Sequence, residues 1–266
     1  MNKLFKLSLI ASLLLFPLAL LAHPLSKIHT IQSMQEIEKY IDHRTLVIFD
    51  LDHTVFEGKN YGYGHANWYY DEIDRGKAKG KNEKEIIFKI FPHWLVSQKD
   101  KSAHVKPVET LTPALIAKLQ KKNNIVMSLT ARQVPLVDIT IKHLVEINID
   151  FSSNTLPDTI IHGFYAPTLM KSGIIFTSEY NDKGEVLKAY LNKLNIHPQK
   201  IVFVDDSKRH LQAVTKFYPH IEVIGLHYPL VAQNKRKNWD GNSAHDDYCN
   251  VAKNHPELSD YALDCV

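Results

Sequence analysis

Short apolar runs alternate with amphipathic segments along most of this chain. Residues 46–49 form a continuous apolar run, and largely apolar runs recur at 124–129 and 200–204. Runs of this length without polar alternation predict strands that are buried on both faces of a sheet. The segments between them carry apolar residues at helical spacing. This alternation predicts an α/β fold with a doubly wound, mostly parallel sheet.

The helix starts have recognisable signals. At 112–122, Thr112 can cap a helix and Pro113 suits the first helical position. Asp182 begins a sequence in which a capping residue is followed three positions later by Glu185. The other predicted elements are a helix with Val137, Ile141 and Leu144, a strand or hairpin arm at 174–176, a helix with Leu211, Val214 and Phe217, and a last strand at 221–226.

The first 22 residues are typical of a secretory signal peptide. Lys3 and Lys6 precede an apolar stretch from Leu7 to Leu21, and Ala22 offers a small residue for cleavage before His23. The alternative is an uncleaved membrane anchor, which normally needs about 20 apolar residues. We therefore predict an exported mature chain of residues 23–266, periplasmic or secreted, without a stable membrane anchor.

The net charge and the cysteine content bear on the partners of the protein and on the compartment in which it works. Cleavage would remove two of the 32 Lys and Arg residues and none of the 29 acidic ones, so the formal net charge would fall from +3 to +1. A nearly neutral chain gives no reason to expect a nucleic-acid partner. The two cysteines, Cys249 and Cys265, would pair in an oxidising compartment and fasten the C-terminal tail, whereas a reducing cytosol would leave them free.

Polar residues follow three of the predicted strands. Carboxyl ends of parallel strands meet at one sheet edge, where ligands bind. Carboxylates from two strands can hold one Mg²⁺, and a nearby hydroxyl and ammonium can hold phosphate oxygens. The chain has no nucleotide-binding glycine loop. These residues are Asp50 and Asp52 after the first strand, Thr130 after the second, Asp205 and Asp206 after a third, and Lys183 at a helix start.

At these positions the chain resembles the phosphatase branch of the haloacid dehalogenase (HAD) superfamily, with four motifs in order. The match spans about residues 44–228, and within the superfamily the chain is most similar to a little-characterised group of exported bacterial proteins. The resemblance implies a HAD-like Rossmannoid fold with a small helical cap inserted after the first strand. The four matching motifs are Asp50-x-Asp52-x-Thr54, Thr130-Ala131-Arg132, Lys183, and Asp205-Asp206.

The resemblance also implies roles. Asp50 would be the nucleophile that forms an aspartyl-phosphate, and Asp52 the general acid and base. Thr130 and Lys183 would hold the phosphoryl group. Mg²⁺ would be bound by Asp50, by the backbone carbonyl of Asp52, and by motif IV, with Asp206 preferred as direct ligand and Asp205 binding a metal water or Lys183.

Three residues leave alternatives open. His53 replaces the more usual Gly, Glu or Asn, and could contact the leaving group or simply pack. Ser128 competes with Thr130 if the strand ends early. Arg132 could grip a second anionic group of the substrate, or be an ordinary surface residue at a helix start.

Residues 57–111 are long enough for the inserted cap, and residues 229–266 are predicted to be a C-terminal tail. The cap holds Trp68-Tyr69-Tyr70 and Trp94. These aromatic side chains could stack against a flat leaving group, or form the cap's own core, which we favour. The basic run 75–84 is predicted to be a solvated loop.

The function predicted is that of an exported, Mg²⁺-dependent phosphomonoester hydrolase acting on a small phosphorylated substrate. A secreted binding or effector protein without turnover is the alternative from another class, although a binder would not need both Asp50 and Asp52. A phosphotransferase or phosphomutase needs the same residues and differs only in the acceptor. The sequence predicts neither the oligomeric state nor the physiological substrate.

Overall fold

The computed structural model of the chain describes residues 26–59, 62–99, 103–122, 124–234 and 239–255, together with Leu258 and Cys265. The predicted signal peptide at 1–22 therefore lies outside the described residues. Within the described part of the chain, no helix combines the length and apolar character that a membrane crossing requires.

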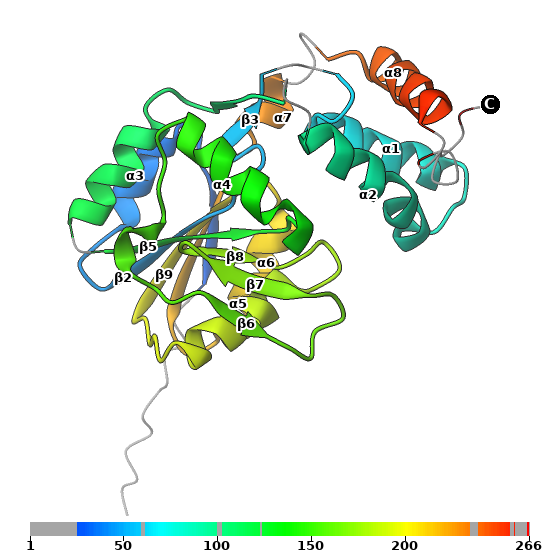
Figure 1. Cartoon of the computed structure of the whole chain (residues 1–266). Helices are drawn as coiled ribbons and strands as arrows, with labels where there is room; N and C mark the ends of the chain where they lie inside the picture. Colours follow the sequence, from blue (N-terminus) through cyan, green and yellow to red (C-terminus); the bar gives the residue numbers. More distant parts are fainter. Residues whose placement is uncertain are drawn as a thin grey trace, which may run out of the picture.

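A mostly parallel eight-stranded sheet forms the centre of the molecule (Figure 1). Its strand order is β1-β10-β9-β2-β5-β8-β7-β6, and pairing is parallel from β1 to β8 and antiparallel in β8-β7-β6. The predicted α/β class is confirmed. The strands are β1 (Lys27–Thr30), β2 (Thr45–Phe49), β5 (Ile125–Thr130), β6 (Thr159–Ile161), β7 (Thr168–Lys171), β8 (Ile174–Phe176), β9 (Lys200–Asp205) and β10 (Glu222–His227).

The sheet edges differ from the sequence prediction. β1 and the β6-β7 hairpin were not predicted, because these strands are short, none is buried on both faces, and so they lack a continuous apolar run. The start of the helix at 112 also differs. Leu111 occupies the N-cap position and Thr112 is already the first helical residue, so Thr112 does not cap this helix as predicted.

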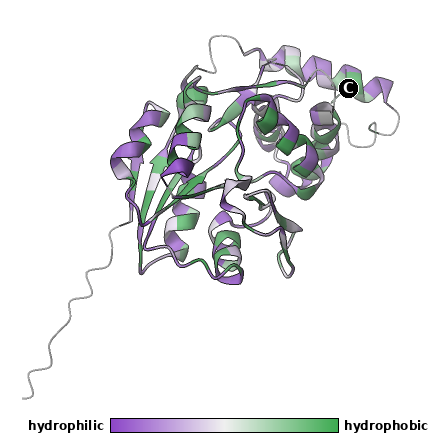
Figure 2. Ribbon diagram, turned by 60° about the vertical axis from the view of Figure 1, so that its left-hand side comes forward, coloured by the Kyte–Doolittle hydropathy of each residue, from purple (hydrophilic) through white to green (hydrophobic). Residues whose placement is uncertain are grey.

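Helices cover both faces of the sheet, and β2 shows why. Successive strand residues point to opposite faces, so Val47 and Phe49 belong to one core cluster and Leu46 and Ile48 to the other. The first face is covered by α3 (Thr112–Lys121), α4 (Val137–Glu146) and the 3-10 helix η1 (Met34–Tyr40), and the second by α5 (Lys183–Lys193) and α6 (Lys208–Phe217). Figure 2 shows the strands mostly hydrophobic and the helices two-sided. Two short 3-10 turns complete this part, η2 (Val134–Leu136) and η3 (Ser152–Asn154).

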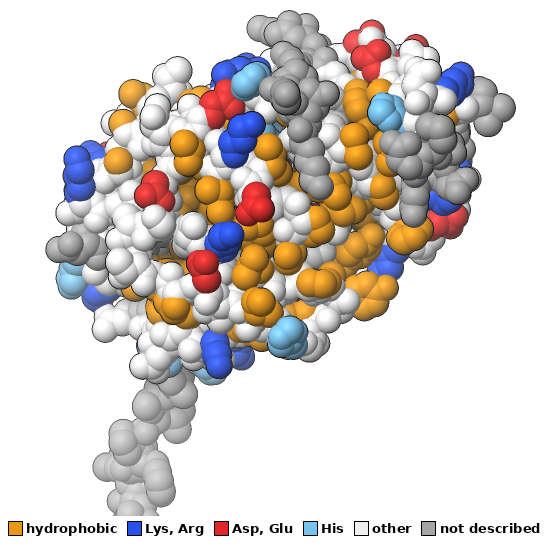
Figure 3. Space-filling model, in the orientation of Figure 1, with side chains coloured by type: hydrophobic (Ala, Val, Ile, Leu, Met, Phe, Trp, Pro, Cys, Tyr) orange, Lys and Arg blue, Asp and Glu red, His pale blue; other side chains and the backbone are white. Residues whose placement is uncertain are grey.

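The predicted cap segment forms a second layer beside the sheet (Figure 1). A two-stranded ribbon, β3 (Phe56–Gly58) paired with β4 (Val105–Pro107), leads to and from two helices, α1 (Ala66–Ala78) and α2 (Glu83–Lys99). Figure 3 shows hydrophobic side chains in a band that runs across this face from the core towards the cap.

The C-terminal region joins this cap. After α7 (Leu230–Asn234), helix α8 (Gly241–Asn254) packs against α1, and Tyr248 of α8 lies in one buried cluster with Trp68 of α1. A disulfide joins Cys249 and Cys265. The cap is therefore built from two segments that are far apart in the sequence.

Candidate active site

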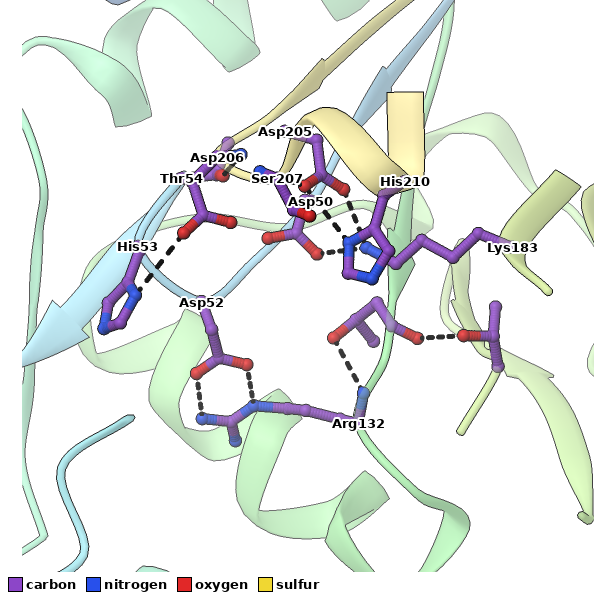
Figure 4. Close-up of polar contacts among 12 residues, drawn as sticks. Asp50, Asp52, His53, Thr54, Arg132, Lys183, Asp205, Asp206, Ser207 and His210 are labelled. Carbon is purple, nitrogen blue, oxygen red and sulfur yellow. Dashed lines mark hydrogen bonds and ion pairs between the residues drawn. The ribbon is translucent and has the colours of Figure 1, made fainter. Parts of the chain in front are cut away.

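The polar residues predicted at the strand ends lie together at one edge of the sheet (Figure 4). Asp50 directly follows β2, and its backbone N–H donates to the carbonyl of Val204 in neighbouring β9. Thr130 is the last residue of β5, and Asp205 the last of β9. Since these strands are parallel neighbours, their carboxyl ends coincide, which is where α/β sheets bind ligands.

Lys183 connects two of the carboxylates. Its ammonium donates hydrogen bonds to Asp50 Oδ1 at 2.6 Å and to Asp205 Oδ2 at 2.8 Å. All three side chains are buried, so the cation offsets negative charge in a region with little water. Lys183 is held there because Asp182 caps α5 by accepting from the backbone N–H groups of Gly184 and Glu185.

Both carboxylate oxygens of Asp205 have polar partners. Its Oδ1 accepts a hydrogen bond from the backbone N–H of Ser207 at 2.8 Å and lies 3.2 Å from Nδ1 of His210. Burial alone would raise the pKa of Asp205, but Lys183 and His210 outweigh it and bring the pKa to about 2. Asp205 therefore stays ionised and anchors Lys183.

The pKa of Asp50 shifts in the opposite direction to that of Asp205. Burial raises the pKa of its carboxyl group well above the usual value, and Lys183 opposes this rise while Asp205 and Asp206 add to it. Burial lowers the pKa of Lys183, but the Asp205 and Asp50 carboxylates outweigh burial and raise it. The ammonium is therefore charged, whereas Asp50 is a carboxyl group whose ionisation a further cation would favour.

The carboxylates of Asp50, Asp205 and Asp206 could bind such a cation. Each offers an oxygen, and these oxygens all lie within 4.8 Å of one another. Carboxylate oxygens suit Mg²⁺, which keeps several waters in its shell. Asp206 is the least buried of the three, and its backbone N–H donates to Thr54 Oγ1 at 3.1 Å. Because Asp205 is already engaged, Asp206 is better placed than Asp205 to offer a free oxygen.

Asp52 is held by Arg132. The guanidinium donates to both carboxylate oxygens, from Nε to Oδ2 at 2.8 Å and from one terminal nitrogen to Oδ1 at 2.9 Å (Figure 4). Burial alone would raise the pKa of Asp52, but the charge and hydrogen bonds of Arg132 outweigh burial and lower it. The Asp52 side chain is not one of the clustered metal-binding carboxylates, so only its backbone carbonyl remains as the predicted ligand.

The position of Arg132 excludes one of the two sequence interpretations. Its side chain is 3% exposed, so it is not a surface residue, and its guanidinium binds Asp52 and also lines the cavity beside Asp52. The guanidinium also donates to Thr140 at 3.1 Å and lies 4.9 Å from the ring centre of Phe56 and 5.6 Å from that of Trp94.

Thr130 and Ser128 occupy different places on β5. Thr130 lies at the strand end, where its Oγ1 accepts from the backbone N–H of Arg132 at 3.1 Å. Its carbonyl accepts hydrogen bonds from the N–H and hydroxyl of Thr177, both at 2.9 Å. Ser128 lies inside the strand, in register with Ile174 of β8, and is fully buried. Thr130 is therefore the hydroxyl that stands at the edge where the carboxylates meet.

A cavity of about 160 Å³ lies beside Asp52, between the cap and the core. It is comparable in volume to a cavity that holds one benzene ring. Its wall combines aromatic rings with polar groups: Phe56, Tyr63, Trp94, Gln98, Arg132 and His143 are among its lining residues. Of the cap aromatics, Trp68 and Tyr69 lie in the cap core, as favoured from the sequence, whereas Trp94 contributes to both the core and the cavity.

Sequence reasoning gave no role to Ser207, His210 or Gln98. Ser207 and His210 bind Asp205 from the loop and first turn that follow β9, and Gln98 reaches Arg132 from α2 at 3.4 Å. A signal existed only for Ser207, because a residue two positions after an Asp often donates its N–H to that side chain. The others come from helical turns that carry no local marker.

Solved structures with a similar fold have low sequence identity to this chain. A predicted phosphatase from Clostridium acetobutylicum has a TM-score of 0.46 and 14% identity, covering 79% of this chain and 98% of that one. A haloacid dehalogenase-like family hydrolase from Streptococcus pneumoniae has a TM-score of 0.42 and 13% identity, covering 73% and 99%.

Relatives in Chlamydia match much more closely in sequence. A protein of Chlamydia trachomatis named "Putative outer membrane protein" is 32% identical over 206 residues, which cover 76% of this chain and 76% of that protein. A protein of the same name from Chlamydia muridarum is 30% identical over 189 residues, covering 70% and 69%. Residues 30–260 match the family described as "Protein of unknown function (DUF2608)", and the chain belongs to that family.

Proposed function

We propose that this protein is an exported, Mg²⁺-dependent phosphomonoester hydrolase of the HAD type, acting through an aspartyl-phosphate on Asp50. The observation that carries the proposal is the setting of Asp50. It is a buried carboxylate at a strand end, 2.6 Å from the Lys183 ammonium and clustered with Asp205 and Asp206. Asp52, two residues on, faces the cavity between the core and the cap.

The residues divide the reaction into two steps. An Asp50 oxygen attacks phosphorus, the bond from phosphorus to the leaving oxygen breaks, and Asp52 gives that oxygen a proton. This step requires that Asp52 is protonated and that Arg132 releases one of its oxygens when the substrate binds. Asp52 then takes a proton from a water that attacks the phosphorus, which releases phosphate and restores Asp50. Lys183 and Thr130 hold the phosphoryl oxygens by a charge-assisted and a neutral hydrogen bond.

Mg²⁺ fits the donor set. Asp50 and Asp206 offer hard carboxylate oxygens, and Asp205 orders Lys183 and the neighbouring backbone. When bound, the cation would neutralise charge on the phosphoryl oxygens and favour ionised Asp50. This matters because Asp50 has a raised pKa without it.

The substrate is inferred from the cavity, and the location from the sequence. The cavity beside Asp52 has room for a small leaving group of about one ring. Export is supported by the signal-peptide pattern of residues 1–22 and by the name "Putative outer membrane protein" that the Chlamydia relatives carry.

The experiment is phosphate release from p-nitrophenyl phosphate by purified residues 23–266, between pH 5 and 8, with Mg²⁺ and then with EDTA. We expect release that needs Mg²⁺, that EDTA removes, and that Asp50→Asn abolishes. Asp138→Asn is the matched control, because the Asp138 side chain is 93% exposed on the same domain. Full activity in the Asp50→Asn protein would refute the nucleophile assignment.

The binding or effector alternative gives a different result. A protein that keeps this site without turnover would release no phosphate from any monoester, and Asp50→Asn would leave its partner binding intact. Release in the presence of an added alcohol, with phosphoryl transfer to that alcohol exceeding hydrolysis, would instead identify a phosphotransferase.

A further inference from the structure

Three consecutive aromatic residues of α1 have different surroundings. Trp68 is fully buried and Tyr69 is 4% exposed, and both belong to the cap core, where the Tyr69 ring lies 4.7 Å from that of Trp94. Tyr70 is 38% exposed and lies outside this cluster. Successive helical residues point about 100° apart. The Tyr70 side chain therefore points out of the cap core, whereas those of Trp68 and Tyr69 pack inside it.

Tyr70 faces the catalytic edge of the sheet. Its ring centre lies 6.2 Å from that of His53, the residue next to Asp52. Together with Tyr69, Asp52 and Glu179 it lines a small cavity of about 20 Å³ at the junction of cap and core. That space is enough for about one water or one oxygen atom of a ligand.

The Tyr70 hydroxyl is a free donor. Among the described residues no hydrogen bond occupies it. Burial raises the pKa of the phenol well above its usual value, and Glu179, Asp206, Asp52 and Asp50 raise it further. The hydroxyl therefore keeps its proton, and its electrostatic neighbours include the carboxylates of the proposed catalytic site.

Building on the phosphatase function proposed above, we infer that Tyr70 contacts the substrate, its hydroxyl donating a hydrogen bond to a non-bridging phosphoryl oxygen. The cap thereby supplies a hydrogen-bond donor to the substrate, in addition to those of the core. A neutral donor suits this place, since a second cation is not available from Arg132, whose guanidinium is bound to Asp52. Contact with the phosphoryl group predicts the same effect for every leaving group.

The test is Tyr70→Phe, which removes one oxygen and keeps the ring, with Tyr40→Phe as matched control. Tyr40 belongs to η1, where its ring stacks on that of His29 at 5.3 Å, and it is not among the residues that line the two cavities beside Asp52. Measurements are kcat/KM for p-nitrophenyl phosphate and for glycerol phosphate, and binding of inorganic phosphate with Mg²⁺ by calorimetry. Circular dichroism checks the fold.

We expect Tyr70→Phe to lower both kcat/KM values about tenfold to a hundredfold and to weaken phosphate binding, with Tyr40→Phe unchanged. A loss with only one of the two substrates, or with phosphate binding unchanged, would place the hydroxyl on the leaving group and overturn the inference. Equal behaviour of both variants and the wild type would overturn it as well.

The calorimetry separates this inference from the phosphatase proposal. If wild-type protein turns over no monoester but binds phosphate, and Tyr70→Phe weakens that binding, the phosphatase function fails and the Tyr70 contact stands. If wild-type protein neither turns over a monoester nor binds phosphate, both fail.

Discussion

Arg132 grips Asp52 with two hydrogen bonds, of 2.8 and 2.9 Å, from different guanidinium nitrogens to different carboxylate oxygens. The same guanidinium is contacted from α2 of the cap by Gln98 and Trp94. The proposed general acid and base is thus connected to the cap through one buried side chain. A paired fork of this kind fixes orientation as well as charge.

Arg132→Gln should therefore reduce both stability and turnover. It leaves Asp52 with no cationic partner, and we expect the free energy of unfolding to fall by about 1–3 kcal/mol. Arg132→Lys is the comparison, because it keeps the charge but cannot reproduce the two-point grip. Urea unfolding and kcat would be measured for both, and the assignment of Arg132 as a positioning residue does not survive if Arg132→Gln has wild-type kcat.

Lys183→Met should destabilise the fold strongly. It leaves Asp50 and Asp205 buried together without their shared cation, a change that typically costs about 3–5 kcal/mol. Lys188→Met, an exposed position on the same helix, is the control and should have little effect. Because Mg²⁺ would bind the same carboxylates, its addition should restore part of the loss in urea unfolding. Equal stability of the two variants would contradict the burial argument.

Gly184→Ala tests the contact between α5 and α6. A Cβ on Gly184 would lie 2.2 Å from the backbone carbonyl oxygen of Ala213, which cannot move independently of α6. We expect a loss of about 1–3 kcal/mol, the usual cost of overpacking. Gly62→Ala serves as reference, since its Cβ would come no closer than 3.9 Å to Asp247. Thermal unfolding of the two variants should differ clearly.

His143 makes stability depend on pH. It is 1% exposed and lies 2.9 Å, through Nε2, from the carbonyl of Ala103. Burial, helped by the nearby Arg132 charge, lowers the pKa of His143 to about 4. The unfolded chain binds this proton near pH 6.5 and the folded chain only near pH 4, so stability falls as pH drops through that window.

The size of this effect would be about 3 kcal/mol if the full difference were realised. His143→Gln removes the titrating group, so its unfolding free energy should change less between pH 7.5 and pH 4.5 than that of the wild type. His162→Gln, at an exposed position, should follow the wild-type curve. Parallel curves for all three proteins would show that His143 titrates normally.

The disulfide should stabilise the C-terminal part of the cap. Cys249 and Cys265 are 16 residues apart, and a loop of this length contributes about 3 kcal/mol in the chain-entropy account. The double variant Cys249→Ala, Cys265→Ala should unfold at lower urea and be cut earlier by protease after α8. Dithiothreitol should reproduce this in the wild type and change nothing further in the double variant.

The local sequence pattern was enough to predict the central strands of the sheet and the edge where the polar residues gather. Buried parallel strands need continuous apolar runs, and the polar residues that end those runs necessarily share one edge. For this reason the sequence alone predicts that Asp50, Thr130 and Asp205 lie together. Lys183 is predicted to lie with them because it stands at a capped helix start. The strands β1, β6 and β7 were not predicted, because partly exposed strands of three or four residues carry no continuous apolar run.

The sequence by itself thus determined the α/β class, the clustering of the strand-end carboxylates, and the chemistry that these groups favour. Each of these depends on residues that are close together in the chain or that lie on neighbouring parallel strands. Only the tertiary structure decided that Arg132 binds Asp52, that α8 completes the cap, and that the Tyr70 ring lies beside His53. Those relations join segments up to about 200 residues apart or depend on how a helix is rotated, and local periodicity contains no information about either.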